Sequence, residues 1–172
     1  MEVTRIIHPI GQGAFYTESI KTNDNLYNVV YDCGSGNHKY TPKRLKQDIA
    51  SFYNPDDVID LLFISHFDND HINGIRELKK RTSNIRNIVV PLIEENDFWY
   101  YQIENPSFET FYRSLSEIAD SAVYRVKPYN EDEEENNIPI NDVAPIILSE
   151  NGRVNKKVFV SYGETLWSIA SR

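Results

Sequence analysis

Length, composition and charge already restrict the class of protein. The chain has 172 residues, enough for one compact domain, and its 40% apolar and 26% charged residues are typical of a globular protein. A net charge of -8 excludes a general nucleic-acid coat, because phosphate binding depends on clustered Lys and Arg. An enzyme that holds cations next to a phosphate is compatible with this balance.

The sequence also indicates a cytoplasmic protein that does not contact membranes. Its single cysteine, Cys33, excludes an internal disulfide and a cysteine-built zinc finger, and it suits a reducing compartment. No apolar run approaches the ~18 residues of a membrane span. The first residues lack the layout of a signal peptide, so secretion is not expected.

Three strands with short turns are predicted in the first third of the chain. Residues 3–10, 14–21 and 26–31 are rich in β-branched and aromatic side chains, and glycine or Asn-Asp-Asn turns separate them. The third run ends in a predicted loop, residues 32–36. Short connections between the three strands predict an antiparallel meander.

The middle of the chain alternates between helix and strand patterns. Amphipathic helices are predicted over residues 42–53, 70–81 and 108–122, where apolar side chains recur every three or four positions. Nearly continuous apolar runs at residues 58–65 and 85–92 are typical of strands buried on both faces. This alternation predicts an α/β fold.

The last third carries less pattern. The acidic residues 131–137 predict a solvated loop, since a calcium loop would need spaced ligands and a turn glycine. Residues 143–149 and 156–162 are predicted to form strands joined by a turn at Glu150-Asn151-Gly152.

Four side chains able to bind metals follow the apolar strand within six residues: His66, Asp68, Asp70 and His71. They stand where a strand ends and a helix begins, which is where α/β proteins place active sites. Alternate residues of an extended stretch point the same way, so we expect His66, Asp68 and Asp70 to converge, with His71 joining from the first helical turn. Two imidazoles and two carboxylates supply parts of two adjacent metal positions.

Structural roles would explain these residues only one at a time. Asp70 would cap the helix at its N-terminus, and Asp68 would lie in a turn. Neither role explains why two His and two Asp gather after a run too apolar to tolerate charge. The spacing therefore favours a metal site.

The segment from Ser65 to Gly74, Ser-His-Phe-Asp-x-Asp-His-x-x-Gly, resembles the metallo-β-lactamase fold superfamily, whose motif is His-x-His-x-Asp-His. Asp68 replaces the second His, a variant similar to that of the ComEC-type competence nucleases. A strand ending in Asp32-Cys33-Gly34 stands where the family has Asp-x-Gly. The resemblance covers roughly residues 1–125 and implies an α/β fold, a metallo-β-lactamase-like αββα sandwich of which this chain would hold the N-terminal half.

The resemblance implies a role for each site residue. His66 and Asp68 would serve the first metal position, Asp70 and His71 the second, and Asp70 would also orient the attacking water. Asp32 would support the metal loop from behind the ligands. The carboxylate of Asp68 favours manganese, magnesium or a mixed pair over two zinc ions.

The implied activity is that of a hydrolase with two divalent metal ions, zinc or manganese, with magnesium also allowed. Metal-activated water would attack a phosphodiester or a similar ester, as in a nuclease or phosphodiesterase. The implied substrate is a nucleic acid or a nucleotide.

The same resemblance implies ligands that this sequence lacks. Such folds complete the site with further histidines and a bridging Asp, yet none of the four histidines follows His71. We expect residues 1–172 to form a single domain that is incomplete at its C-terminus, with an acidic loop at about 130–142.

The missing ligands leave three alternatives. The chain is a fragment of a longer protein, or a protein partner or second copy completes the site, or the site is degenerate. In the last case the chain is a non-catalytic partner-binding module with a half or degenerate metal site.

Other positions carry weaker signals. His38 and Lys39 are expected to line the cleft and contact substrate phosphate. Cys33 fits a small residue at a strand end better than a nucleophile. Asp60 is expected to join the carboxylates near the strand end. The aromatic run at residues 98–101 favours core or interface packing over a base-stacking platform.

Overall fold

The computed structural model describes residues 1–36, 41–126, 146–147 and 157–158. It divides into two compact units, Met1–Val126 and Lys127–Arg172. Within the described part of the chain, no helix has the length and apolar content needed to cross a membrane.

A six-stranded sheet forms the first unit, and its strands lie in the same order in space as along the chain. The first three pair antiparallel, which confirms the predicted meander, and the next three are added in parallel. The strands are β1 (Glu2–Ile7), β2 (Phe15–Lys21), β3 (Leu26–Cys33), β4 (Val58–Phe63), β5 (Asn84–Pro91) and β6 (Ala122–Val126).

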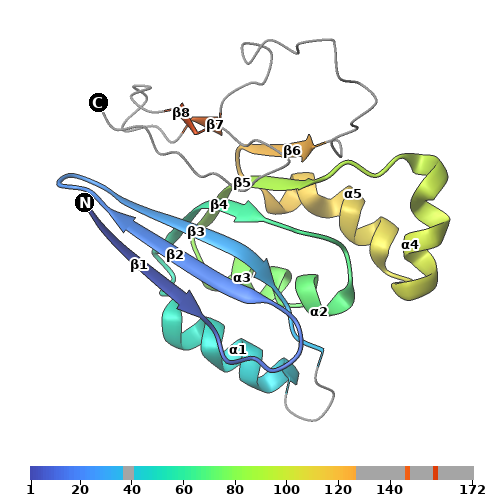
Figure 1. Ribbon diagram of the computed structural model, residues 1–172, viewed down its shortest axis with the longest axis horizontal. Coiled ribbons are helices and arrows are strands. Elements are labelled where there is room, and N and C mark those ends of the chain that lie inside the picture. The colour runs from blue at the N-terminus through green and yellow to red at the C-terminus, as the bar shows by residue number, and fades with distance from the viewer. Residues whose placement is uncertain (37–40, 127–145, 148–156, 159–172) are drawn as a thin grey trace, which may run out of the picture. The chain divides into compact units, whose positions relative to one another are not determined.

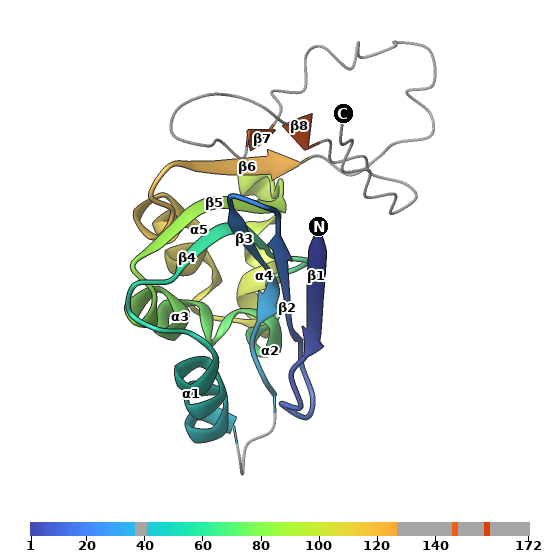
Figure 2. The same ribbon diagram turned by 90° about the vertical axis from the view of Figure 1, so that its left-hand side faces the viewer.

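Helices connect the parallel strands and cover one face of the sheet (Figures 1 and 2). Crossovers between parallel strands are right-handed, so successive crossovers in one direction place their helices on the same face. The helices are α1 (Thr41–Phe52), α2 (Asn69–Ile72), α3 (Ile75–Arg81), the 3₁₀ turn η1 (Glu95–Asp97), α4 (Phe98–Glu104) and α5 (Phe108–Ile118).

The core lies between this helix layer and the sheet. Its fully buried side chains come from both layers: Ile49, Ile75, Leu78, Phe108 and Leu115 from helices, and Val30, Leu62, Ile85 and Ile88 from strands. Residues Ile59 to Phe63 are all buried, as expected for a strand enclosed on both faces. The unit therefore supplies one helix layer and one sheet of an αββα sandwich.

The predicted helix over residues 70–81 is interrupted, because Gly74 packs against β3. The amide of Gly74 donates a hydrogen bond of 2.8 Å to the carbonyl of Cys33. A Cβ at Gly74 would lie 2.7 Å from that carbonyl oxygen, so only glycine allows this approach. The break ends α2 at Ile72 and lets α3 start in a new direction.

Three elements of the first unit were not predicted: η1, α4 and β6. The helix predicted to residue 122 ends at Ile118, and β6 begins at Ala122. The helix α4 contains the aromatic run, of which Phe98 is buried while Trp99 and Tyr100 are exposed at 62% and 60%.

In the second unit the structure describes one antiparallel strand pair, β7 (Ile146–Ile147) with β8 (Lys157–Val158). This pair lies within the two strands predicted for residues 143–149 and 156–162. The acidic loop at 131–137 lies outside the described residues.

Candidate metal centre

The candidate site lies where β3 and β4 end side by side. The two strands are parallel, and Tyr31 is paired with Phe63, so their carboxyl ends meet at one edge of the sheet. Asp32 stands at the end of β3, and the loop after β4 carries His66 before α2 begins at Asn69. This is the edge at which α/β sheets place ligand-binding residues.

Three side chains gather there. Ligand atoms of Asp32, His66 and His71 lie within 4.8 Å of one another. The centroids of the two imidazole rings are 3.8 Å apart, with their planes inclined by 50°. Asp32 is only 1% exposed, whereas both histidines are partly exposed, so the rings form the accessible part of the cluster.

Asp32 is the centre of a hydrogen-bond network. Its Oδ1 accepts from the backbone N–H of Ser65 at 2.8 Å, and its Oδ2 accepts from Ser65 Oγ at 2.5 Å. His71 Nδ1 lies 2.8 Å from the same Oδ2, and Ser65 Oγ lies 2.8 Å from His66 Nδ1. One buried carboxylate and one hydroxyl therefore connect both rings.

Asp32 adopts a conformation that is uncommon for a residue with a side chain. Its φ of 54° lies in the left-handed region, where non-glycine residues are disfavoured. Such conformations persist where the surroundings hold them, commonly at functional sites. Here three hydrogen bonds to the carboxylate hold Asp32 in this conformation.

Asp68 lies next to the cluster. Its Oδ2 is 3.5 Å from His66 Nε2, and its side chain is 60% exposed. Asp68 thus faces the ring nitrogen that points away from Ser65.

Asp70 is held mainly by its backbone. Its carbonyl oxygen accepts from Ala14 N–H at 3.3 Å. Among the described residues no hydrogen bond or ion pair occupies the Asp70 carboxylate. Residues 64–68 separate β4 from α2, so Asp70 lies on a helix and not on an extended stretch. Its role as a ligand stays a prediction.

Close backbone packing fixes the segment that carries Asp70 and His71. A Cβ at Gly34 would lie 2.5 Å from the carbonyl carbons of both residues, and a Cβ at Gly13 would lie 2.3 Å from the Asp70 carbonyl oxygen. Gly13 also has a φ of 107°, which favours glycine. The glycines in the two loops therefore allow three segments of backbone to meet behind the site.

Asn73 fastens the loop after β3 to the end of α2. Its Oδ1 accepts from Ser35 N–H at 3.1 Å, and its Nδ2 donates to the Ser35 carbonyl at 2.8 Å. The backbone N–H and the carbonyl oxygen of Ser35 are thus both hydrogen-bonded to one side chain. Ser35 Oγ donates in turn to the Ile10 carbonyl at 2.7 Å.

Phe67 anchors the loop between the two candidate ligands His66 and Asp68. Its ring is 1% exposed and makes edge contacts with four aromatic rings, those of Tyr101, Phe108, Phe111 and Tyr112. The side chains on either side of Phe67 consequently face outward.

Asp60 does not belong to the carboxylate group, contrary to the expectation. It accepts a 2.8 Å hydrogen bond from the Asn28 amide and pairs with Arg86 at 2.5 Å. Burial raises the pKa of the Asp60 carboxyl, an effect that these hydrogen bonds oppose. Asp60 therefore serves the sheet and not the site.

Cys33 is a buried packing residue. Burial, with a smaller contribution from the charge of Asp32, raises the pKa of its thiol, so the thiolate is disfavoured. This agrees with the interpretation that Cys33 is not a nucleophile.

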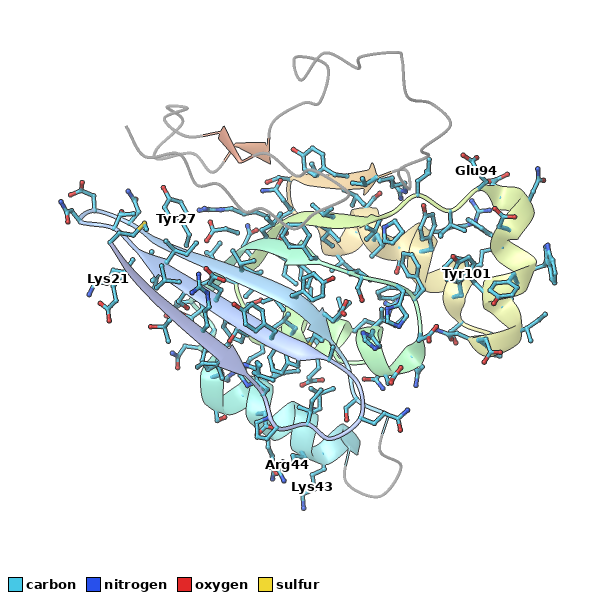
Figure 3. All side chains as sticks on the ribbon, viewed as in Figure 1. Lys21, Tyr27, Lys43, Arg44, Glu94 and Tyr101 are labelled. Carbon is cyan, nitrogen blue, oxygen red and sulfur yellow. The ribbon has the colours of Figure 1, made fainter. Side chains whose placement is uncertain are left out.

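The proposed phosphate contacts are only partly described. His38 and Lys39 lie outside the described residues. Lys43 and Arg44, on the neighbouring helix α1, point away from the sheet (Figure 3). Lys46 pairs with Glu77 at 3.1 Å. Lys43, Arg44 and Lys46 therefore lie on a solvated surface of α1.

Sequence reasoning missed Ser65 and Asn73. Ser65 directly precedes His66, and its position between an apolar strand and a histidine was the available signal. Asn73 had no local signal, because its partner is Ser35, which is 38 positions away in the sequence.

The donor set fits a divalent metal ion. Imidazole nitrogens suit zinc, iron and manganese, and carboxylates suit harder cations. Both rings have one nitrogen engaged with Ser65 or Asp32, which leaves Nε2 of each ring for a metal, and Asp68 Oδ2 is close to one of them. Ligating histidines are held in this manner by their second nitrogen.

Comparison with known families agrees with this geometry. The family model described as the metallo-beta-lactamase superfamily matches residues 22–146, which include Asp32 and the whole segment from His66 to His71. Comparisons with curated proteins and with solved structures found no significant match. The match covers more than two thirds of the chain and contains every described residue of the cluster. The chain therefore belongs to the metallo-β-lactamase superfamily.

Proposed function

We propose that this protein is a metal-dependent hydrolase that cleaves a phosphodiester or a similar ester. The observation that carries the proposal is the cluster of Asp32, His66 and His71 at the ends of two parallel strands, with Asp68 beside it. Its donor set, and the membership of a superfamily that is generally hydrolytic, support metal-assisted hydrolysis over a structural role.

Each residue of the candidate site has a distinct role in this proposal. His66, Asp68 and His71 hold the metal, and Asp32 keeps the two rings in place. Asp70 completes a second metal position and orients the attacking water, a role supported by its place between Asp68 and His71 in the same segment. A divalent ion at this site supplies a lowered pKa for water and polarisation of a phosphoryl oxygen.

The remaining ligand positions come from outside the described residues or from a partner chain. The three side chains assigned to the metal, His66, Asp68 and His71, leave coordination positions open, whichever metal binds. Open positions suit catalysis, and they also suit a protein partner that contributes a ligand. His38 and Lys39 then contact substrate phosphate, and a nucleotide or nucleic acid is the substrate class.

Metal content tests the site. The purified chain is loaded with Zn²⁺ or Mn²⁺, dialysed, and analysed by inductively coupled plasma mass spectrometry. The double variant Asp70→Ala with His71→Ala should retain much less metal than the parent chain. Asp24→Ala removes a carboxylate from an exposed turn and should retain as much as the parent. Equal metal in the double variant and the parent would refute the site.

Hydrolysis separates an enzyme from a binding module. Bis(4-nitrophenyl) phosphate serves as a chemically simple phosphodiester, with release of nitrophenolate as the signal. Metal-dependent release that is lost in Asp68→Ala and in His71→Ala supports the hydrolase. A stable chain that binds metal but releases no product from this or any nucleotide ester instead supports the non-catalytic partner-binding module.

A further inference from the structure

The network behind the two histidines fixes where their protons lie. Ser65 Oγ donates its hydrogen bond to Asp32 Oδ2, at 2.5 Å, so the proton of the hydroxyl lies between these two oxygens. A hydroxyl has one proton. Because that proton is used in the hydrogen bond to Asp32, Ser65 Oγ can only accept a hydrogen bond from His66 Nδ1, which lies 2.8 Å away.

It follows that His66 carries its proton on Nδ1. His71 carries its proton on Nδ1 as well, because its partner at 2.8 Å is the same acceptor, Asp32 Oδ2. In each neutral ring the lone pair then lies on Nε2. The two rings are held in the same tautomer by one carboxylate, directly for His71 and through Ser65 for His66.

We propose that Ser65 is a positioning residue: it donates to Asp32 and accepts from His66 Nδ1, while His71 Nδ1 donates directly to Asp32. Both imidazoles then present Nε2 lone pairs to a divalent metal. The proposal rests on the metal site proposed above. It adds that the Ser65 hydroxyl is required for one ring only, whereas the Asp32 carboxylate is required for both. The arrangement is built into the chain before any metal arrives.

Two substitutions separate these roles. Ser65→Ala removes the acceptor of His66 Nδ1 but leaves the bond between His71 and Asp32. Ser65→Thr keeps a hydroxyl at the same position. We therefore expect the two variants to differ in the tautomer of His66 and to have the same tautomer of His71.

Asp32→Asn makes a sharper prediction, because the amide is forced into one orientation. The Ser65 backbone N–H donates to Oδ1, so the amide oxygen takes that place and the NH₂ group takes the place of Oδ2. The NH₂ group donates to His71 Nδ1 and to Ser65 Oγ. The Ser65 proton then turns to His66 Nδ1, and both rings reverse to the tautomer with a proton on Nε2.

The experiment reads the tautomers directly in the metal-free chain. Long-range ¹H–¹⁵N correlation spectra of ¹⁵N-labelled protein are recorded at a pH of about 8.5, two units above the reference pKa of a histidine side chain. The parent and Ser65→Thr should show a protonated Nδ1 in both rings. Ser65→Ala should lose this pattern at His66 only, and Asp32→Asn should reverse it at both rings.

His8 provides an internal reference, because it lies in a different network, with Nε2 3.0 Å from Thr17 Oγ1. Its signals should be the same in every variant. Ser19→Ala, which removes a hydroxyl bonded to Asn28 Oδ1 at 2.9 Å, is the matched control for loss of a serine hydroxyl. It should leave all histidine signals unchanged.

Metal affinity is the second readout. Zn²⁺ binding by competition with a chromogenic chelator should weaken about 10- to 100-fold in Ser65→Ala and Asp32→Asn. In Ser65→Thr and Ser19→Ala it should stay near that of the parent. Should Asp32→Asn fail to fold, the Ser65 pair alone decides the question.

Two outcomes overturn the proposal. One is a parent spectrum in which either ring carries its proton on Nε2. The other is Ser65→Ala with a parent-like His66 and parent-like zinc affinity. Because the spectra are taken without metal or substrate, absence of hydrolytic activity refutes the proposed function and leaves this inference standing.

Discussion

Adding a single methyl group at Gly34 should displace the backbone of the candidate ligands. In Gly34→Ala the new Cβ would lie 2.5 Å from the carbonyl carbons of Asp70 and His71 and 2.5 Å from the Asp70 carbonyl oxygen. Ordinary contacts begin near 3.4 Å, so the two segments must separate by about 1 Å. All three obstructing atoms are backbone, so no side-chain rotation relieves the overlap.

The magnitude follows from overpacking in a well-packed region. We expect Gly34→Ala to lower the free energy of unfolding by roughly 2 kcal/mol, which corresponds to a fall in melting temperature of about 5–10 °C. Metal affinity should fall with it, because the displaced backbone carries His71. Differential scanning fluorimetry measures the first effect and chelator competition the second.

Gly36→Ala is the matched control in the same loop. The nearest atoms to its Cβ are side-chain atoms of Asp70 and Gln12 at 3.1–3.3 Å, so the required movement is only a few tenths of an ångström. We expect a much smaller loss of stability. The reasoning is refuted by a Gly34→Ala chain that melts and binds metal like the parent, or by a Gly36→Ala chain that is equally damaged.

Three further predictions concern the anchor, the metal and pH. Phe67→Ala leaves a cavity among four aromatic rings and should lower the free energy of unfolding, measured in urea titrations, by about 3–5 kcal/mol. A loss below about 1 kcal/mol would mean that Phe67 does not anchor the loop. Zn²⁺ at about 100 times its dissociation constant should stabilise the parent by about 2.7 kcal/mol in thermal melts, and an equal gain in Asp68→Ala with His71→Ala would contradict the assigned ligands. Burial lowers the pKa of His8 below its reference value of 6.5, so the native state binds fewer protons at His8 than the unfolded chain does. The contribution of His8 to the free energy of unfolding is therefore fully present above pH 6.5 and is lost as the pH falls through the pKa of the folded state. His8→Gln should therefore lose less stability than the parent between pH 7 and pH 5, and parallel losses in urea titrations would show that His8 is not responsible.

Sequence patterns predicted correctly those elements that depend on residues close together in the chain. The meander, α1 and the strand β4 follow from β-branched runs, turn residues and apolar periodicity, and each of these signals involves neighbouring residues. The His66–His71 segment was found in the same way, since its residues are close in sequence. Its membership of the superfamily was visible for that reason.

The rest depends on contacts between distant segments. Gly74 looked compatible with a helix, and only its contact with Cys33 explains the break. Ser65 and Asn73 looked like ordinary polar residues until Asp32 and Ser35 were placed beside them. Asp60 was predicted near the strand end because its sequence position is close, but its partner Arg86 belongs to the next strand.

The sheet grows in chain order, and this has a consequence for synthesis on the ribosome. Every strand from β2 to β6 docks on the strand made just before it, so no pairing waits for a later segment. Domains fold as units during synthesis, beginning at the N-terminus. Asp32, Ser65, His66 and His71 come together once β4 and α2 have emerged. A nascent chain therefore brings the candidate metal cluster together before the strands β5 and β6 are added to the sheet.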